Sequence, residues 1–312
     1  MRLAVAGLGF MGGVHIKALE SVEGVELGAV VSRRAPEGPG KHYARLEDAL
    51  GDPDIDAVDL CLPTDMHESA TIAALGAGKH VLVEKPMALS VESCRRMIEA
   101  AERAKRVLMV AQVLRFFPAY KELQRVVDTG ELGTIRSAVF RRRCAQPGWS
   151  EWITDRSRSG GGGFDLLIHD VDMSLRLFGA PSAISATGYE DAGKGIDVIG
   201  ARLYYDGFVA EISGGWMGAG KFPFAMEFTV LGDGGVLEYN SESRPLKKYG
   251  SGKDMALEQV DGYAAEIAYF AECCRKGQQP WLCTPENSTE AVRLTLAMFE
   301  ARSKNGERIS WK

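Results

Sequence analysis

The sequence opens with a short apolar run that leads directly into a glycine-rich turn. Residues 3–7 predict a buried strand, and residues 7–12 then read G-x-G-x-x-G. Between a strand and a helix, such glycines permit a tight bend, close approach of a pyrophosphate and close packing of the helix, whose first amides face the anion. The turn therefore predicts a dinucleotide site, the alternative being a glycine-rich turn without a ligand. The residues expected to contact the dinucleotide are Gly7, Gly9, Phe10, Met11 and Gly12.

Short apolar runs alternate with helical patterns up to about residue 111. Strands are expected at residues 25–31, 57–61, 80–83 and 107–111, and helices at 11–21, 66–77 and 90–104. Strands that alternate with helices of about ten residues or more predict a parallel sheet with helices on both faces. The near-continuous apolar runs are typical of strands that are buried on both sides.

After Pro118 the pattern changes from alternating strands and helices to successive strands. One strand is expected at residues 134–143 and a helix at 164–178, and five strand patterns then follow up to about residue 239. The pair Asp206-Gly207 between two apolar runs is a typical hairpin signal. Successive strands with short turns indicate an antiparallel or mixed sheet.

Helical patterns return near the end of the sequence, at residues 263–276 and 285–303. The sequence therefore predicts an α/β dinucleotide-binding domain over residues 1–118 and an α+β domain over residues 119–312. Residues 32–40, which hold two prolines and two glycines, are expected to form a surface loop.

Composition argues against several classes of protein. The chain has 312 residues, of which 46% are hydrophobic and 25% charged, and this argues against disorder of its bulk. Its 37 Lys and Arg against 42 Asp and Glu give a net charge of −5, whereas a nucleic-acid-binding protein normally carries a basic surface. No run approaches the ~18 apolar residues of a membrane span, and early glycines interrupt any signal peptide, so we expect a cytoplasmic location.

The six cysteines show neither a C-x-x-C motif nor a zinc-finger spacing with histidine. A chain of this length can bury a sufficient core without disulfides. We therefore expect reduced thiols, no bound metal and no nucleophilic cysteine.

The residues after the second predicted strand bear on the choice of dinucleotide. In sites that prefer NAD, an acidic residue about 20 positions after the glycines accepts a hydrogen bond from the ribose 2′-hydroxyl. Here Ser32 stands twenty residues after Gly12 and is followed by Arg33 and Arg34. A hydroxyl with two guanidinium groups suits a 2′-phosphate, which a carboxylate would repel. The segment predicts NADP(H) over NAD(H), and the alternative is that both arginines are solvated loop charges.

A second motif, Glu84-Lys85-Pro86, follows the strand predicted at residues 80–83. Ligands of open parallel sheets bind beyond the carboxyl ends of the strands, so we expect Lys85 beside a nicotinamide ring. A lysine there can hydrogen-bond a substrate hydroxyl and favour its alkoxide, or take part in proton transfer. The Lys85–Pro86 peptide bond is open to the cis form.

A third set of polar residues lies in the helix expected at residues 164–178. Asp165, His169 and Asp172 are spaced i, i+4, i+7, which places them on one helical face. Histidine suits proton transfer near neutral pH, and a carboxylate one turn away can orient its ring. The alternative is an acidic helix N-terminus that complements the helix dipole.

Other positions are candidates for substrate contacts. Arg115 follows a predicted strand end, where its guanidinium could bind a hydroxyl or a carboxylate. Trp149 and Trp152 flank a polar loop and could stack on a sugar ring, although aromatic residues in loops often only pack at the surface. Asp172 is a further candidate, with the acidic helix end described above as its alternative role.

Together, these motifs resemble one known family. The similar segments are residues 7–12, Leu62-Pro63-Thr64, His67, Glu84-Lys85-Pro86 and residues 161–172. They are similar to the Gfo/Idh/MocA family, which includes glucose-fructose oxidoreductase and inositol dehydrogenase. The resemblance covers nearly the whole chain and is weakest after about residue 220. It implies a Rossmann domain followed by a domain with an open-faced, mostly antiparallel sheet.

The resemblance also implies roles for the matching residues. Lys85 matches the active-site lysine, His169 matches the proposed general acid/base of sugar and cyclitol dehydrogenases, and Asp165 matches a carboxylate that holds substrate or assists proton transfer. Thr64 matches a cofactor-contacting position. Ser32 stands where an acidic residue is commonest in the family. In this respect the chain resembles some members that use NADP. Further residues expected near the cofactor are Leu62, Pro63, His67 and Glu84.

On this basis we expect an NADP(H)-dependent oxidoreductase that interconverts a secondary alcohol and a ketone on a sugar, sugar derivative or cyclitol, with NAD(H) as the alternative cofactor. The resemblance also leaves room for a dihydrodiol or imine substrate, for NAD-dependent glycosidase chemistry, and for a non-catalytic dinucleotide-binding regulator. An open-faced sheet would expose a large apolar surface in a monomer, so a homodimer or homotetramer through that face is expected. Neither nucleic acid nor membrane is an expected partner.

Overall fold

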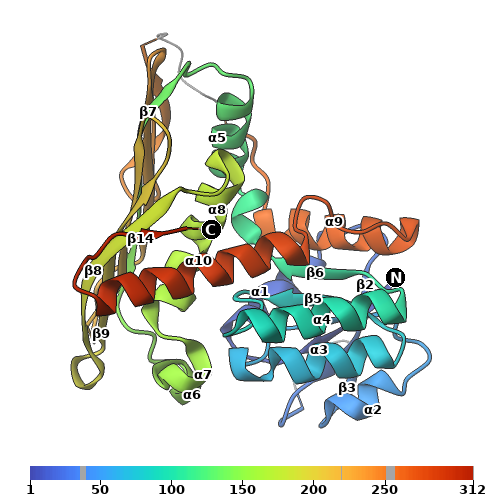
Figure 1. Cartoon of the computed structure of the whole chain (residues 1–312). Helices are drawn as coiled ribbons and strands as arrows, with labels where there is room; N and C mark the ends of the chain where they lie inside the picture. Colours follow the sequence, from blue (N-terminus) through green and yellow to red (C-terminus); the bar gives the residue numbers. More distant parts are fainter. Residues whose placement is uncertain (36–39, 219, 251–256, 312) are drawn as a thin grey trace. The chain divides into compact units, whose positions relative to one another are not determined.

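The structure of the chain is a computed structural model, and it describes residues 1–35, 40–218, 220–250 and 257–311. Backbone packing separates two compact units, Met1–Phe117 with Val260–Thr289 and Pro118–Gln259 with Glu290–Lys312 (Figure 1). The first change of unit lies next to the expected boundary at residue 118. Residues 260–289, however, pack with the first unit, although the sequence grouped them with the second domain. Part of the loop expected at residues 32–40, namely 36–39, lies outside the described residues.

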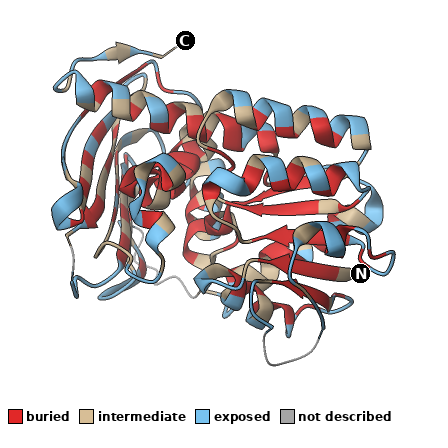
Figure 2. Cartoon of the chain, turned by 90° about the horizontal axis from the view of Figure 1, so that it is seen from below, coloured by how far each residue is buried: buried red, intermediate tan, exposed pale blue. Residues whose placement is uncertain are grey.

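A six-stranded parallel sheet forms the centre of the first unit. Its strands are β1 (Arg2–Ala6), β2 (Glu26–Val31), β3 (Lys41–Tyr43), β4 (Ala57–Leu60), β5 (His80–Glu84) and β6 (Leu108–Ala111). They lie in the order β3-β2-β1-β4-β5-β6, and every neighbouring pair is parallel. The strands β1, β4, β5 and β6 are buried almost throughout (Figure 2). The predicted parallel sheet with buried strands is confirmed.

Helices surround this sheet. They are α1 (Phe10–Leu19), α2 (Leu46–Leu50), α3 (His67–Gly76), α4 (Val91–Ala104) and α9 (Gly262–Lys276), with 3₁₀ turns at Thr64–Met66 and Val113–Arg115. The helix α9 packs against α1 in an apolar cluster that contains Ala18, Leu19 and Phe270. A side-chain cap begins α4, because the Ser90 hydroxyl accepts a 3.1 Å hydrogen bond from the Ser93 amide.

An eight-stranded mixed sheet forms the centre of the second unit. Its strands are β7 (Ile135–Cys144), β8 (Ala183–Asp191), β9 (Ile196–Tyr204), β10 (Val209–Met217), β11 (Ala225–Gly232), β12 (Gly235–Asn240), β13 (Arg244–Tyr249) and β14 (Ile309–Ser310). The order is β13-β12-β11-β7-β10-β9-β8-β14, and all neighbours are antiparallel except β7 and β10. The predicted hairpin joins β9 to β10, where the Tyr205 amide donates to the Phe208 carbonyl over 3.0 Å.

Helices cover one face of this sheet. The helices of the segment are α5 (Pro118–Asp128), α6 (Glu151–Thr154), α7 (Arg156–Ser159), a π-helical turn at Gly163–Leu167, α8 (Ile168–Phe178) and a 3₁₀ turn at Ala192–Lys194, and α10 (Pro285–Ser303) follows later in the chain. The π-helical turn and α8 contact β7 and β10, and among the described residues no helix covers the opposite face (Figure 1). Within the described ranges, no helix is long and apolar enough to cross a membrane.

The middle of the open face of the sheet is polar, whereas the adjacent row of the same face is largely apolar and contains Tyr249, Val236, Leu231, Val209 and Tyr204. The expected apolar surface is therefore present in part, with Leu231 41% and Tyr249 43% exposed. Two rows of residues cross the polar middle, and strand register places them side by side. One row contains Glu238, Thr229, Val139, Glu211, Arg202 and Ser185, and the next contains Asn240, Glu227, Arg141, Ser213, Gly200 and Thr187. Ion pairs join Arg141 to Glu227 and Arg202 to Glu211 within these rows. The alternation of buried and exposed residues was visible in the sequence, but the register that gathers the charges was not.

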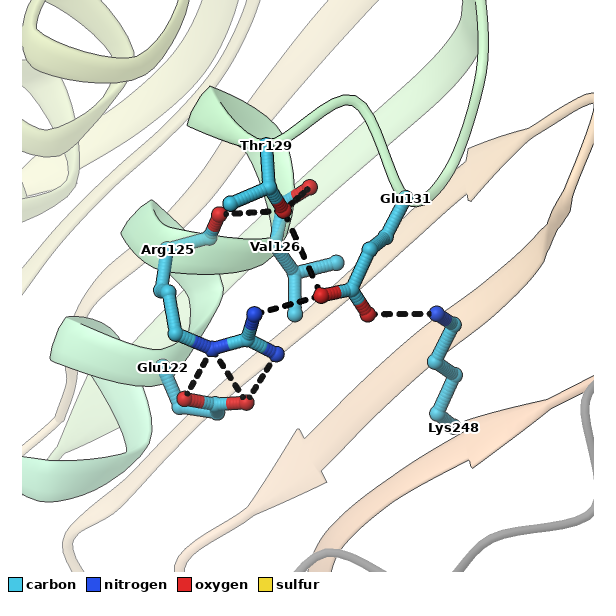
Figure 3. A network of polar contacts seen from close by, with 6 residues as sticks. All are labelled: Glu122, Arg125, Val126, Thr129, Glu131 and Lys248. Atoms are coloured by element: carbon cyan, nitrogen blue, oxygen red, sulfur yellow. Dashed lines mark hydrogen bonds and ion pairs between the residues drawn. The ribbon is translucent and has the colours of Figure 1, made fainter.

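A network of ion pairs ties the end of α5 to the edge of this sheet (Figure 3). Glu131 accepts a hydrogen bond from Arg125 on α5 and a 2.8 Å hydrogen bond from Lys248 on β13. The hydrogen bonds from Arg125 and Lys248 lower the pKa of Glu131 to about 2. The Thr129 hydroxyl donates to the Arg125 carbonyl over 2.8 Å and completes the helix end. Because these ion pairs are exposed to solvent, the network contributes little to the free energy of unfolding.

Candidate active site

Three adjacent strands of the first sheet end at the same edge. The strands β1, β4 and β5 are neighbours and parallel, with Ala6 opposite Leu60 and Leu60 opposite Val83. The glycine-rich turn (residues 7–12) follows β1. The Leu62 turn (residues 62–64) follows β4, and the Lys85 corner (residues 84–86) lies at the end of β5. Because the carboxyl ends of parallel strands meet at one edge, the three predicted parts of the cofactor site lie side by side.

The glycine-rich turn has the geometry that its spacing predicts. Gly7 has φ of 99°, and a Cβ there would collide with the Cys61 carbonyl. A Cβ on Gly12 would collide with the Gly7 carbonyl, so this glycine allows α1 to pack closely on the turn. A Cβ on Gly9, in contrast, would have no atom within 4 Å. Gly7 and Gly12 therefore shape the turn, whereas Gly9 leaves the space that a pyrophosphate needs in front of the first amides of α1.

The segment after β2 lies at the same edge. The Ser32 amide donates to the Tyr43 carbonyl over 3.0 Å, and the Ser32 hydroxyl donates to the Arg34 carbonyl over 2.6 Å. This hydroxyl oxygen keeps its capacity to accept a hydrogen bond. Arg33 and Arg34 are exposed, so their guanidinium groups are accessible to an anion. This arrangement of Ser32, Arg33 and Arg34 is compatible with binding the ribose of a dinucleotide. It is equally compatible with the alternative that both arginines are only solvated.

His67 joins the two other turns. Its Nδ1 lies 2.9 Å from the Pro86 carbonyl oxygen and its Nε2 lies 2.9 Å from the Leu62 carbonyl oxygen. The side chain is buried, and burial lowers its pKa despite these two carbonyls. Both ring nitrogens thus contact backbone carbonyls, and His67 links the Leu62 turn to the Lys85 corner. Thr64, which begins the 3₁₀ turn between them, is buried.

Lys85 lies at the corner after β5, and the Lys85–Pro86 peptide bond is cis. The carboxylate of Glu84 is buried, and its Oε2 accepts a 2.9 Å hydrogen bond from the Lys85 amide. Its Oε1 lies 3.2 Å from Nε2 of His15 on α1. Glu84 was expected near the cofactor, but both of its carboxylate oxygens contact groups of the first unit, namely the Lys85 amide and the His15 ring.

A buried cluster of ionisable side chains lies below this corner, and sequence analysis missed it. His15, Asp59, Glu84 and Glu266 are each at most 6% exposed, and they come from α1, β4, β5 and α9. His15 Nδ1 lies 2.7 Å from Asp59 Oδ2. Neither carboxylate oxygen of Glu266 has a hydrogen-bond partner among the described residues. The sequence signal that could have found the cluster is Asp59, a charge within an otherwise apolar strand pattern.

Three side chains of this region, His15, Asp59 and Cys61, offer possible metal-ligand atoms within 4.8 Å of one another. Two such ligands of a tetrahedral zinc ion would lie ~3.3 Å apart, given bonds of about 2.0–2.1 Å. The 2.7 Å separation of His15 Nδ1 and Asp59 Oδ2 is instead a charge-assisted hydrogen-bond distance. Burial raises the pKa of the Cys61 thiol, which disfavours the thiolate that a metal or a nucleophilic role requires.

The predicted polar helix of the second unit begins with an irregular turn. The expected helix is present over its whole length, but Gly163–Leu167 is π-helical and α8 starts only at Ile168. The regular i, i+4 spacing assumed for Asp165 and His169 therefore does not hold across this junction. His169 is 9% exposed and Asp172 is 1% exposed. π-Helical turns are rare and occur often at functional sites.

Two residues that the sequence did not single out hold this segment. Trp216 Nε1 on β10 donates a 2.9 Å hydrogen bond to Asp165 Oδ2. Asp197 on β9 accepts a 2.8 Å hydrogen bond from the Gly162 amide and is itself paired with Arg302 at 2.6 Å. A side chain at Gly162 would press on the Asp197 carbonyl and Trp216. The glycine run is thus what allows the segment to pack tightly against the sheet.

The predicted substrate contacts Trp149, Trp152 and Arg115 differ in exposure and in hydrogen bonding. Trp149 is 50% exposed, and its ring lies 6.2 Å from that of Trp152 at 66°, which is an edge-to-face pair. Trp152 is partly buried, so the exposed ring of Trp149 is the one that can offer a face to a sugar ring. Arg115 donates to the Leu282 carbonyl, so part of its guanidinium is used to hold the segment between α9 and α10. The first unit carries Lys85 and Arg115, and the second carries Asp165, His169, Asp172 and both tryptophans.

Comparison with known proteins decides the family. Residues 1–112 match a family described as "Oxidoreductase family, NAD-binding Rossmann fold", and residues 120–238 match the "GFO/IDH/MocA C-terminal domain". The 1,5-anhydro-D-fructose reductase of Ensifer adhaerens is 33% identical over 275 residues, which cover 85% of this chain and 82% of the relative. The chain belongs to the Gfo/Idh/MocA family of oxidoreductases.

Other relatives are similar over different shares of the chain. The scyllo-inositol 2-dehydrogenase (NAD(+)) of Bacillus subtilis is 30% identical over 90% of this chain and 88% of its own length. An oxidoreductase of Rhizobium meliloti is 35% identical, but over only 57% of its own length. Among solved structures, myo-inositol 2-dehydrogenase from Lactobacillus plantarum superposes with a TM-score of 0.85 at 22% identity, covering 100% of this chain and 99% of the other. This structural likeness supports the two-part fold with a Rossmann sheet and a mostly antiparallel sheet.

Proposed function

We propose that this chain is an NADP(H)-dependent oxidoreductase that interconverts a secondary alcohol and a ketone on a sugar, a sugar derivative or a cyclitol. The observation that carries the proposal is the position of Lys85 on the same sheet edge as the glycine-rich turn. The names of the family members above, which act on inositols or an anhydrofructose, support the class of substrate.

The residues of the first unit suit a nicotinamide dinucleotide. The open space at Gly9 and the first amides of α1 would hold the pyrophosphate, and the Leu62-Pro63-Thr64 turn would border the nicotinamide end. Phe10, which is 63% exposed, and Met11 would line the entrance to the turn. When bound, the dinucleotide supplies the hydride acceptor or donor, a chemistry that no side chain provides.

The protein's own contribution is to position the substrate and to move its hydroxyl proton. In the direction of oxidation, the Lys85 ammonium donates a hydrogen bond to the reacting oxygen and stabilises negative charge on it. His169 accepts the hydroxyl proton as general base, because imidazole can exchange a proton near neutral pH. Asp165, which Trp216 holds by its hydrogen bond, orients the imidazole or binds the substrate. Asp172 and the Trp149–Trp152 pair are the proposed contacts to the rest of the substrate.

The proposed preference for NADP(H) rests on Ser32, Arg33 and Arg34. No carboxylate occupies these positions, and both guanidinium groups are exposed at the end of β2. Charge-assisted hydrogen bonds to a 2′-phosphate are roughly twice as strong as neutral ones. Two arginines there would therefore favour the phosphorylated cofactor.

A homodimer or homotetramer through the open face of the second sheet stays a prediction. Because that face carries rows of polar and charged side chains beside the apolar residues Leu231, Val236 and Tyr249, such an interface would combine hydrogen bonds and ion pairs with apolar burial. Its association would then weaken as the salt concentration rises. Light scattering at low and high salt measures this directly.

The experiment that tests the proposed function follows nicotinamide absorbance with the purified chain. A panel of sugars, cyclitols and polyols is offered with NADP⁺ and NAD⁺ side by side, and the corresponding ketones with NADPH and NADH. Turnover with NADP(H) at higher kcat/KM supports the proposal. Turnover with NAD(H) alone overturns the cofactor preference, and no turnover in either direction overturns the proposed activity.

A further inference from the structure

The cluster below the Lys85 corner forms a continuous chain of polar contacts. His15 Nδ1 and Asp59 Oδ2 form a hydrogen bond of 2.7 Å. His15 Nε2 lies 3.2 Å from Glu84 Oε1, which is an ion-pair contact without the geometry of a hydrogen bond. The other oxygen of Glu84 accepts the 2.9 Å hydrogen bond from the Lys85 amide. The chain therefore runs from the end of β4, through α1, to the backbone of the residue proposed to bind the reacting oxygen.

The charges around His15 favour its imidazolium form. Both ring nitrogens face carboxylates, and only the imidazolium can donate a proton toward each of them. Burial alone lowers the pKa of His15, but the contacts with Asp59 and, after it, Cys61 outweigh burial and raise the pKa well above the usual value. Burial alone raises the pKa of Glu84, but the contact with His15 and the charge of Lys85 outweigh it and lower that pKa.

Every element packed against His15 contributes to its surroundings. From β4 and the turn after it come Asp59 and Cys61, whose Sγ lies 3.5 Å from His15 Nδ1. From β5 comes Glu84. From α9 come Glu266, which feels the charges of His15, Glu84 and Asp59, and Tyr263, whose ring centroid lies 5.8 Å from that of His15.

We propose that Asp59, His15 and Glu84 form a positioning triad that fixes the backbone at Lys85. Asp59 orients the His15 ring, the ring holds the Glu84 carboxylate, and the carboxylate holds the Lys85 amide. His15 touches neither substrate nor cofactor in this role, so it is a positioning residue. The significance of the triad for turnover rests on the proposed function of Lys85, whereas its effect on the Lys85 backbone does not.

The triad also predicts a dependence on pH. When His15 loses a proton, the hydrogen bond to Asp59 retains the proton on Nδ1, and Nε2 then presents a lone pair to the Glu84 carboxylate. Two acceptors that face each other in a buried site repel, so Glu84 releases the Lys85 amide. Turnover should therefore fall on the alkaline side as His15 deprotonates.

Two substitutions of one residue separate the two ring nitrogens. In His15→Gln the side-chain amide nitrogen can take the place of Nε2 beside Glu84, whereas in His15→Asn it can take only the place of Nδ1 beside Asp59. The matched control is His80→Asn at the start of β5, where His80 Nδ1 accepts a 3.0 Å hydrogen bond from the Val107 amide, far along the strand from Lys85. Circular dichroism and thermal melts establish that each variant is folded.

Three readouts test the triad. Hydrogen exchange of the cofactor-free chain follows the amides of residues 84–88 by mass spectrometry. Steady-state kinetics gives kcat and KM from pH 6 to 10, and fluorescence titration gives the Kd of the cofactor. We expect His15→Asn to exchange faster at the Lys85 corner and to lose about 10-fold or more in kcat, with the cofactor Kd within about threefold.

The conservative variant and the control complete the test. His15→Gln should keep wild-type exchange and most of kcat at pH 7, and its alkaline fall in kcat should differ from that of the wild type, since its amide does not titrate. His80→Asn should match the wild type in all three readouts. If the Lys85 corner exchanges at the wild-type rate in both His15 variants, or if both lose activity equally, the positioning triad is overturned. If the wild type itself turns over no substrate but His15→Asn alone exchanges faster, the triad stands and the proposed function fails.

Discussion

Trp216 Nε1 donates a 2.9 Å hydrogen bond to Oδ2 of Asp165. This bond ties β10 to the π-helical turn that begins the segment carrying His169. Replacing Trp216 by Phe keeps an aromatic ring against Ile153 and Leu166 but removes the hydrogen-bond donor. We expect kcat to fall by about 5- to 30-fold with the cofactor Kd unchanged, and stability to fall by about 1 kcal/mol. Trp281→Phe, at a 66% exposed position, is the control and should leave kcat unaltered. Equal kcat in the wild type and Trp216→Phe would contradict this role for the bond.

The strand ends and the glycine-rich turn were predictable because local sequence determines them. The G-x-G-x-x-G spacing sets where the backbone bends, and apolar runs set which strands are buried. The positions of Gly9 and Lys85 on one sheet edge follow from these local patterns together with the parallel order of the strands.

The contacts between distant segments could not be predicted in this way. The pairing of His15 with Glu84 depends on how α1 packs on the sheet, and periodicity gives the buried face of a helix but not its neighbour. The same reason hides the packing of α9 with the first unit. The π-helical turn before Ile168 was missed because apolar spacing does not distinguish it from one more α-helical turn.

The second prediction separates the pyrophosphate contact from the fold of the glycine-rich turn. Gly9→Ala places a methyl group in open space, so it should leave the melting temperature nearly unchanged but block a phosphate. We expect the Kd of either dinucleotide to rise about 10-fold or more, a loss of about 1.4 kcal/mol or more in binding. Gly13→Ala, which also has no atom within 4 Å of its Cβ, is the matched control and should bind normally. Calorimetric titration measures the Kd of each dinucleotide. An unchanged Kd in Gly9→Ala would show that the pyrophosphate does not bind next to Gly9.

The third prediction concerns the 2′-phosphate. Charge reversal at Arg33 and Arg34 together should weaken NADPH binding by about 10- to 100-fold, because two charge-assisted contacts become repulsions. NADH, which lacks the phosphate, should bind within about threefold of the wild type. Arg95 and Arg103 on α4 provide a control with the same change in net charge, and their double reversal should affect both cofactors equally and little. An equal loss for NADPH and NADH in the Arg33/Arg34 variant would show that these arginines do not read the phosphate.

The fourth prediction concerns Glu266, which is fully buried with neither oxygen hydrogen-bonded among the described residues. Burial raises its pKa well above the usual value, so the folded chain keeps a proton that the unfolded chain releases above about pH 4.3. The contribution of protonated Glu266 to the free energy of unfolding is fully present below that pH. It is lost as the pH rises toward the pKa of Glu266 in the folded chain. Glu266→Met removes this loss, so its gain in unfolding free energy should be larger at pH 7 than at pH 5, by up to about 1.4 kcal/mol per pH unit.

Urea denaturation at the two pH values measures this effect. Glu272→Met, at an exposed position of the same helix, is the control and should change stability by at most about 0.5 kcal/mol at either pH. A gain that is equal at pH 5 and pH 7 would mean that Glu266 is ionised in the folded chain.

The most direct test of the proposed chemistry compares Lys85→Met with the wild type on the best substrate of the panel. If Lys85 binds the reacting oxygen, kcat should fall by about 10²–10⁴-fold while the Kd of the cofactor stays within about threefold. Lys17→Met, at an exposed position on α1, should keep full activity. Absorbance of the reduced nicotinamide gives kcat, and its fluorescence gives the Kd. A Lys85→Met chain that turns over at the wild-type rate would contradict the account.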